Sequence, residues 1–196
     1  MQLTHVMKTL RDPNAQVRAA AAWGACELLT TWWELLPGQA ISRIMVLLQD
    51  TAFDGDAPKV RMALLEGLAV LVENPLVRSF SASAVHHVFS IAAVTNRMNM
   101  AVLYLQAQHS MALLLPNLRP VLFDANMNVR VRMASLMMRV SQIQELKWWT
   151  VIPVPELLHV MGNDCDPVAK IIQAMLFSQF IETRASGNLE VSFKHG

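Results

Sequence analysis

Four polar turns divide the chain, and apolar residues at helical spacing follow each of them. Each turn contains an aspartate, then a valine, then a basic residue one or two positions after the valine. Counted from that valine, apolar residues recur near offsets 0, 3, 4, 7, 8 and 11, which trace one stripe along an α-helix. The pattern therefore predicts four similar helices, whose first stripe positions are Val17, Val60, Val129 and Val168.

The spacing of the four turns predicts the architecture. Val17 and Val60 are 43 positions apart, and Val129 and Val168 are 39 apart. A repeat of about 40–47 residues is typical of HEAT and armadillo helix pairs. We therefore expect an all-α, HEAT-type helical-repeat solenoid of about four to five helix pairs. Such a fold presents a long binding surface and no enclosed active site.

The charged residues of the turns have structural roles in this interpretation. An aspartate ahead of each stripe can accept hydrogen bonds from the free N–H groups at the helix start. The bases six residues after Asp12, Asp124 and Asp164 can reach the aspartate of a stacked neighbour; they are Arg18, Arg130 and Lys170. We expect a ladder of ion pairs between repeats, with partner binding as the alternative role.

Two glycines and two tryptophan pairs repeat along the chain. Gly24 and Gly67 share one phase of the stripe, which predicts close approach of neighbouring helices there. Residues 32–37 (WWELLP) and 148–153 (WWTVIP) both read Trp-Trp, three residues, Pro, and the proline predicts a turn between repeats. Adjacent tryptophans on a helix diverge, so one can fill the core while the other packs on a neighbour or is exposed. Core filling is one role for Trp32, Trp33, Trp148 and Trp149; anchoring a partner peptide is the other.

The spacing between the second and third turns is longer than one repeat. Val60 and Val129 are 69 positions apart, a surplus that falls near residues 81–107. This stretch is an added helix, an irregular loop or translated non-coding sequence. We thus divide the chain into HEAT repeats at 1–80, an irregular insertion or extra helix at 81–108, HEAT repeats at 109–182 and a disordered tail at 183–196.

Composition narrows the classes of protein. Hydrophobic residues make up 54%, but no apolar run approaches the roughly 20 residues that cross a bilayer. The net charge of +1 gives no global electrostatic case for nucleic acid. The two cysteines, Cys26 and Cys165, are far apart in sequence and are expected to be reduced core thiols of a cytosolic or nuclear protein.

Motifs that carry chemistry are few. No phosphate-binding GxxxxGK[ST] loop and no zinc-ligand spacing occur, so we expect no cofactor, metal site, small-molecule substrate or enzymatic activity. His86 and His87 are adjacent and would diverge on a helix. Arg132, Arg139 and Lys147 lie along one polar strip, which is either a solvated helix face or a contact for DNA phosphates without sequence specificity.

Several short motifs occur in an order that resembles one family, the G-type HEAT subunits of condensin II. They are LRDP at 10–13, VR at 17–18, WWELLP at 32–37, AFD at 52–54, VR at 60–61, LLPNL at 114–118, LFD at 122–124, VRV at 129–131 and WTVIP at 149–153. The resemblance covers about residues 8–80 and 109–182. Residues 81–107 and the tail after Ile181 have no counterpart.

The resemblance implies a non-catalytic scaffold in the nucleus, on chromosomes. A subunit of this type binds the kleisin of the complex, and through it the SMC ATPase pair and the other HEAT subunit. With the kleisin it helps the complex engage DNA during mitotic chromosome condensation. Because members of the family are several times longer, the chain would be an internal segment or a truncated product. The alternative is a generic HEAT-repeat adaptor, of the transport-receptor or phosphatase-scaffold type.

Overall fold

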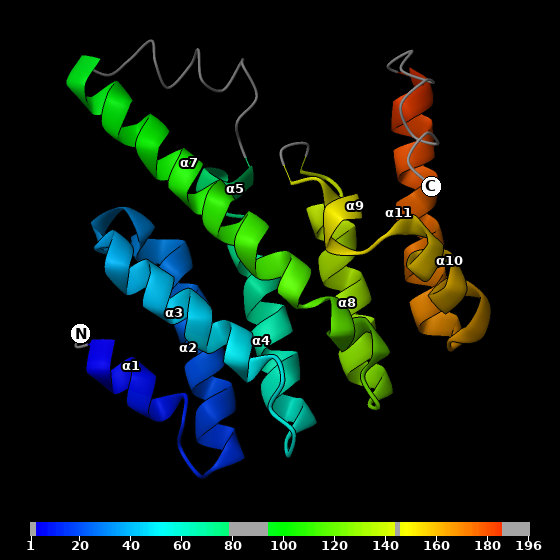
Figure 1. The fold of residues 1–196 in the computed structure, drawn as a ribbon, viewed down its shortest axis with the longest axis horizontal. Coiled ribbons are helices and arrows are strands. Elements are labelled where there is room, and N and C mark those ends of the chain that lie inside the picture. The colour runs from blue at the N-terminus through cyan, green and yellow to red at the C-terminus, as the bar shows by residue number, and fades with distance from the viewer. Residues whose placement is uncertain (1–2, 79–93, 144–145, 186–196) are drawn as a thin grey trace.

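The computed structural model describes residues 3–78, 94–143 and 146–185, and this part of the chain is mostly helical (Figure 1). In chain order its helices are α1 (Leu3–Thr9), α2 (Ala15–Trp32), η1 (Trp33–Leu35), α3 (Gly38–Thr51), α4 (Pro58–Leu71), α5 (Pro75–Arg78), α7 (Val94–Asn117), η2 (Arg119–Phe123), α8 (Met127–Val140), α9 (Trp148–Val151), α10 (Val154–Asn163) and α11 (Asp166–Ala185). No strand occurs in these ranges. The predicted all-α helical-repeat fold is confirmed.

The four helices predicted from the valine stripes stack in sequence order. Helix α2 packs on α4, α4 on α8, and α8 on α11. Helices α1, α3, α7 and α10 each precede one of them, so the described residues form four helix pairs (Figure 1). One continuous hydrophobic cluster runs through all four pairs. The predicted stripe is buried where the stacked helix of a preceding repeat packs on it: Val60, Val129 and Val168 are 0% exposed, whereas Val17, on the first stacked helix, is 36% exposed.

The turns before α2 and α8 are built alike, but their aspartates do not cap the helices. Asn14 and Asn126 are the N-cap residues, and each side chain accepts from the N–H two residues ahead at 2.9 Å. Asp12 and Asp124 instead accept from the N–H groups of these asparagines at 2.8 Å. The predicted capping role is therefore wrong for these two aspartates, which stabilise the turn one step before the helix.

Three arginines connect successive repeats. The ion pairs are Arg18 with Asp54 (2.6 Å), Arg61 with Asp124 (2.7 Å) and Arg130 with Asp164 (2.7 Å). No side chain of the six is more than 20% exposed. Each arginine also donates from Nη1 to the carbonyl of the ladder aspartate in its own repeat. We call this row the ladder, and it confirms the predicted pairing of Arg18 and Arg130.

The ladder differs from the prediction at two places. In the second repeat the acidic member is Asp54, which precedes its arginine by seven residues and not by the six of the other repeats. At the end of the ladder, Lys170 pairs with Asp166 of its own helix at 3.8 Å, and both side chains are largely exposed. Exposed pairs of this kind contribute little to stability.

The last ion pair of the ladder, between Arg130 and Asp164, makes the stability of the fold depend on pH. Hydrogen bonding from Arg130, opposed by desolvation, lowers the pKa of Asp164 to about 2. An unfolded aspartate titrates near pH ~4, so the rung contributes about 2 kcal/mol above that pH and loses it as the pH falls from ~4 to ~2. We expect the urea midpoint of Asp164→Asn to fall less steeply than that of the unmodified chain between pH 5 and 2. Parallel pH profiles would contradict this role.

Gly67 brings α4 against α2. A Cβ atom added there would lie 2.8 Å from Cβ and 2.9 Å from Sγ of Cys26. The Cys26 thiol is fully buried, and its burial raises the pKa to about 12. The predicted close approach is therefore confirmed at Gly67. At Gly24 it is wrong, because nothing lies within 4 Å of the corresponding position.

Substitutions at the two glycines are expected to have opposite effects on stability. We expect Gly67→Leu to lower the free energy of unfolding by roughly 1–3 kcal/mol, because the added side chain overpacks the contact with Cys26. Gly24→Ala is expected to raise it by about 0.5–1 kcal/mol, since alanine favours the helix and meets no neighbour. Urea denaturation at low micromolar protein measures both. A Gly67→Leu midpoint equal to that of the unmodified chain would count against the tight contact.

The predicted insertion is partly described. Residues 94–108 belong to α7, which continues without a break to Asn117 and packs on α3 and α5. The remainder of the predicted insertion, with His86 and His87, lies outside the described residues. So does the predicted tail, except that residues 183–185 end α11.

Candidate partner-binding surface

The two tryptophan turns lie at one edge of the stack. Both follow a stacked helix and precede the helix of the next pair: Pro37 is the N-cap of α3, and Pro153 that of α10. Since α2, α4 and α8 are equivalent helices of successive repeats, their C-terminal ends share an edge. We call it the tryptophan edge; the ladder follows the opposite edge, where each stacked helix begins (Figure 1).

Each turn buries one tryptophan and exposes the other. Trp33 is 2% exposed and Trp32 is 53% exposed. In the second turn the order is reversed, with Trp148 at 8% and Trp149 at 51%. The rings of Trp148 and Trp149 meet edge to face at 5.8 Å, and Trp148 Nε1 donates to Gln179 Oε1 at 3.3 Å. Trp33 and Trp148 therefore fill the core, which leaves Trp32 and Trp149 as candidate anchors for a partner.

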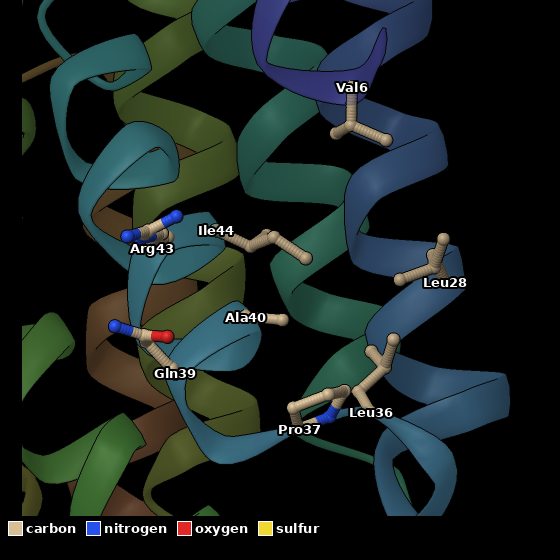
Figure 2. Close-up of a pocket in the computed structure, with 8 residues that line it drawn as sticks. All are labelled: Val6, Leu28, Leu36, Pro37, Gln39, Ala40, Arg43 and Ile44. Carbon is tan, nitrogen blue, oxygen red and sulfur yellow. The ribbon is translucent and has the colours of Figure 1, made fainter. Parts of the chain in front are cut away.

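An apolar cleft of about 330 Å³ lies beside the first tryptophan turn. Its lining comes from α1, α2, the turn and α3: Val6, Leu28, Leu36, Pro37, Gln39, Ala40, Arg43 and Ile44. In Figure 2, Ala40 and Ile44 point across the cleft toward Leu28 and Leu36. Arg43 and Gln39 lie on its α3 side and give it a polar rim. The sequence pattern identified Leu36 and Pro37 as a turn and did not indicate the cleft, which depends on how α1, α2 and α3 pack together.

The predicted basic strip is paired with acids. Arg132 lies 2.8 Å from Glu66, and Arg139 pairs with Glu73, both across the contact between α4 and α8. All four side chains are 39–51% exposed. Glu66 and Glu73 have the same seven-residue spacing as Arg132 and Arg139, and this shared spacing is the sequence signal for the two pairs. Lys147 is exposed at the start of α9.

Other chemistry is sparse in the described ranges. Within residues 3–78, 94–143 and 146–185, no three His, Cys, Asp or Glu side chains gather into a metal-binding group. No helix of this part is both long and apolar enough to cross a membrane. Cys26 and Cys165 are both free, the first buried and the second half-buried.

Comparison with known proteins gives consistent matches. The chain is 26% identical over 180 residues to the condensin-2 complex subunit G2 of Danio rerio. It is 23% identical to the same subunit of Xenopus laevis and 22% identical to that of Homo sapiens. Each match covers 91–92% of this chain. The resemblance to condensin-2 subunit G2 is confirmed.

The similarity to subunit G2 concerns a segment of that protein. The chain spans 13% of the length of the curated relatives that it matches. No protein-family model matches the chain, and no solved structure matches it significantly. The likeness to subunit G2 thus comes from the ordered sequence match, and the helical-repeat architecture from the structure itself.

Proposed function

We propose that the chain is a non-catalytic scaffold segment of a condensin II complex in the nucleus. It binds the kleisin, and through it the SMC ATPase pair and the other HEAT subunit, and it helps the complex engage DNA during mitotic chromosome condensation. The observation that carries the proposal is the match to subunit G2 over 91% of the chain. A stack of helix pairs with long edges supports it, because such stacks bind extended segments.

The tryptophan edge is the part of the scaffold that we assign to the kleisin. Its two exposed rings, Trp32 and Trp149, belong to different repeats, so an extended peptide that contacts both must lie along the stack. The cleft beside Leu36 and Pro37 adds an apolar pocket next to the first ring. Large exposed aromatic side chains are common anchors of protein interfaces.

A pull-down with the C-terminal half of the kleisin tests this assignment. We expect Trp32→Ala with Trp149→Ala to reduce recovery at least tenfold. The matched control is Phe53→Ala with Phe123→Ala, since these rings are 48% and 51% exposed but lie at the ladder edge. Equal losses in both double variants would contradict the tryptophan edge. Recovery of transport or phosphatase components by the intact protein, without kleisin or SMC subunits, would favour the generic adaptor instead.

DNA binding is expected to be weak, independent of sequence and sensitive to salt. Three phosphate contacts, from Arg132, Arg139 and Lys147, would give a log–log salt slope of about −2 to −3 on duplex DNA. Glu66 and Glu73 hold the two arginines, so changing both to glutamine is expected to raise affinity severalfold. Changing all three bases to alanine is expected to abolish binding, measured by fluorescence anisotropy. If neither the glutamine nor the alanine changes alter the affinity for DNA, the basic strip does not contact DNA.

A further inference from the structure

A polar residue occupies one position of the apolar stripe in the fourth stacked helix. The other three stacked helices, α2, α4 and α8, have an apolar residue eleven positions after the first valine of the stripe; these residues are Leu28, Leu71 and Val140. In α11 the same position is Gln179, and its side chain is half-buried. A carboxamide placed there costs free energy unless its polar atoms find hydrogen-bond partners. Its partners therefore indicate what this glutamine does.

The carboxamide of Gln179 connects the end of α8 to the second tryptophan turn. Its Nε2 donates to the backbone carbonyl of Ser141 at 2.9 Å. Ser141 is the C-cap residue of α8 and is buried. Its Oε1 accepts the hydrogen bond from Trp148 Nε1 at 3.3 Å. One side chain of α11 thus fixes the buried ring of the turn relative to the helix that precedes it.

The buried ring of the turn contacts the exposed one. The planes of Trp148 and Trp149 meet at 84°, so the two indoles form an edge-to-face pair. Such pairs are attractive only over a limited range of relative orientations. The direction of the exposed Trp149 ring therefore depends on that of Trp148. A chain of contacts leads from α11 through Gln179 and Trp148 to the candidate anchor.

We propose that Gln179 is a positioning residue, which holds the exposed Trp149 ring in the orientation that receives the partner. This inference rests on the proposed binding of the kleisin at the tryptophan edge. A ring that is already held loses less conformational freedom on binding than a ring that rotates freely. The fourth helix pair therefore contributes to affinity through Trp149, without its glutamine touching the kleisin.

A related hydrogen bond at the first tryptophan turn provides a matched control. Asn74 follows α4 and donates from Nδ2 to the backbone carbonyl of Thr30, in the last turn of α2, at 2.5 Å. Like the bond from Gln179 to Ser141, it joins the end of a stacked helix to the next repeat. Replacing Asn74 removes a bond of the same type but leaves the link between Gln179 and Trp148 in place.

Nuclear magnetic resonance of the full chain tests the positioning role directly. Nuclear Overhauser contacts between the Trp148 and Trp149 rings report their edge-to-face geometry. We expect Gln179→Met to lose these contacts, because methionine fills a similar volume but accepts no comparable hydrogen bond from Trp148 Nε1. Asn74→Leu is expected to retain them, although both variants lower the urea midpoint. Ring contacts that persist in Gln179→Met, or that disappear in both variants, would overturn the proposal.

Affinity for the C-terminal half of the kleisin, measured by fluorescence anisotropy, tests the consequence for binding. Gln179→Met and Trp148→Phe remove the two sides of one hydrogen bond, so each is expected to weaken binding about three- to tenfold. The double variant is expected to bind no more weakly than either single variant. Losses that multiply would overturn the link, and so would an affinity that stays unchanged after the ring contacts are lost. If the unmodified chain does not bind the kleisin, the proposed function fails, and the ring contacts alone then confirm or overturn the positioning of Trp149 by Gln179.

Discussion

Replacing Arg61 by methionine is expected to lower the free energy of unfolding by about 3–5 kcal/mol. Arg61 and Asp124 are only 10% and 11% exposed, and the guanidinium also donates to the carbonyl of Asp54. Removing one partner leaves a carboxylate charged and poorly solvated, which costs far more than the intact pair contributes. The rung also joins the second and third repeats, which the break in spacing separates in sequence.

The control for this prediction joins the same two helices. Arg132 pairs with Glu66 across α4 and α8, as Arg61 links these repeats, but its side chain is 51% exposed. Water can solvate the glutamate once the arginine is gone, so Arg132→Met is expected to cost less than about 1 kcal/mol. Urea denaturation followed by far-UV circular dichroism measures both variants. Similar losses for the two arginines would show that burial does not determine the strength of these pairs.

The second large effect is expected at the first tryptophan turn. Trp33→Ala removes a ring that is 2% exposed and is expected to cost about 3–5 kcal/mol through the lost contacts and the cavity. Trp32→Ala removes a neighbouring ring that is 53% exposed and is expected to cost less than about 1 kcal/mol. The same denaturation assay compares them. If Trp32→Ala proves as destabilising as Trp33→Ala, the assignment of one core ring and one exposed ring is wrong.

The hydrophobic pattern predicts which face of each helix is apolar, but it does not predict whether another helix covers that face. Periodicity predicts the buried stripes that begin at Val60 and Val129, because helical spacing alone brings their members to one face. The same pattern failed at Val17 and Gly24, since burial there requires a neighbouring helix that the described residues do not supply. Periodicity identifies a face, and the tertiary structure decides whether anything covers it.

The tryptophan turns show a second limit. Their sequences have the same spacing, yet Trp33 is buried in one and Trp148 in the other. Trp32 is the last residue of the long helix α2, so the rotation of that helix sets the direction of its side chain. Trp148 is the first residue of the four-residue helix α9, which follows a connection from α8. The orientation of an adjacent pair therefore depends on the preceding backbone. A short motif does not contain that information.

The position of the ladder has a mechanical consequence. Three short ion pairs fix the distances between repeats along the edge where the stacked helices begin. The tryptophan edge carries exposed rings, and the Arg139–Glu73 pair that joins α8 to the end of α4 there is about half exposed and therefore weak. When the stack bends, the ladder edge therefore acts as an inextensible spine, and strain is taken up as opening or closing between repeats at the other edge. Resistance to bending is then unequal in different directions, and the softest deformation is the one that changes the spacing of Trp32 and Trp149.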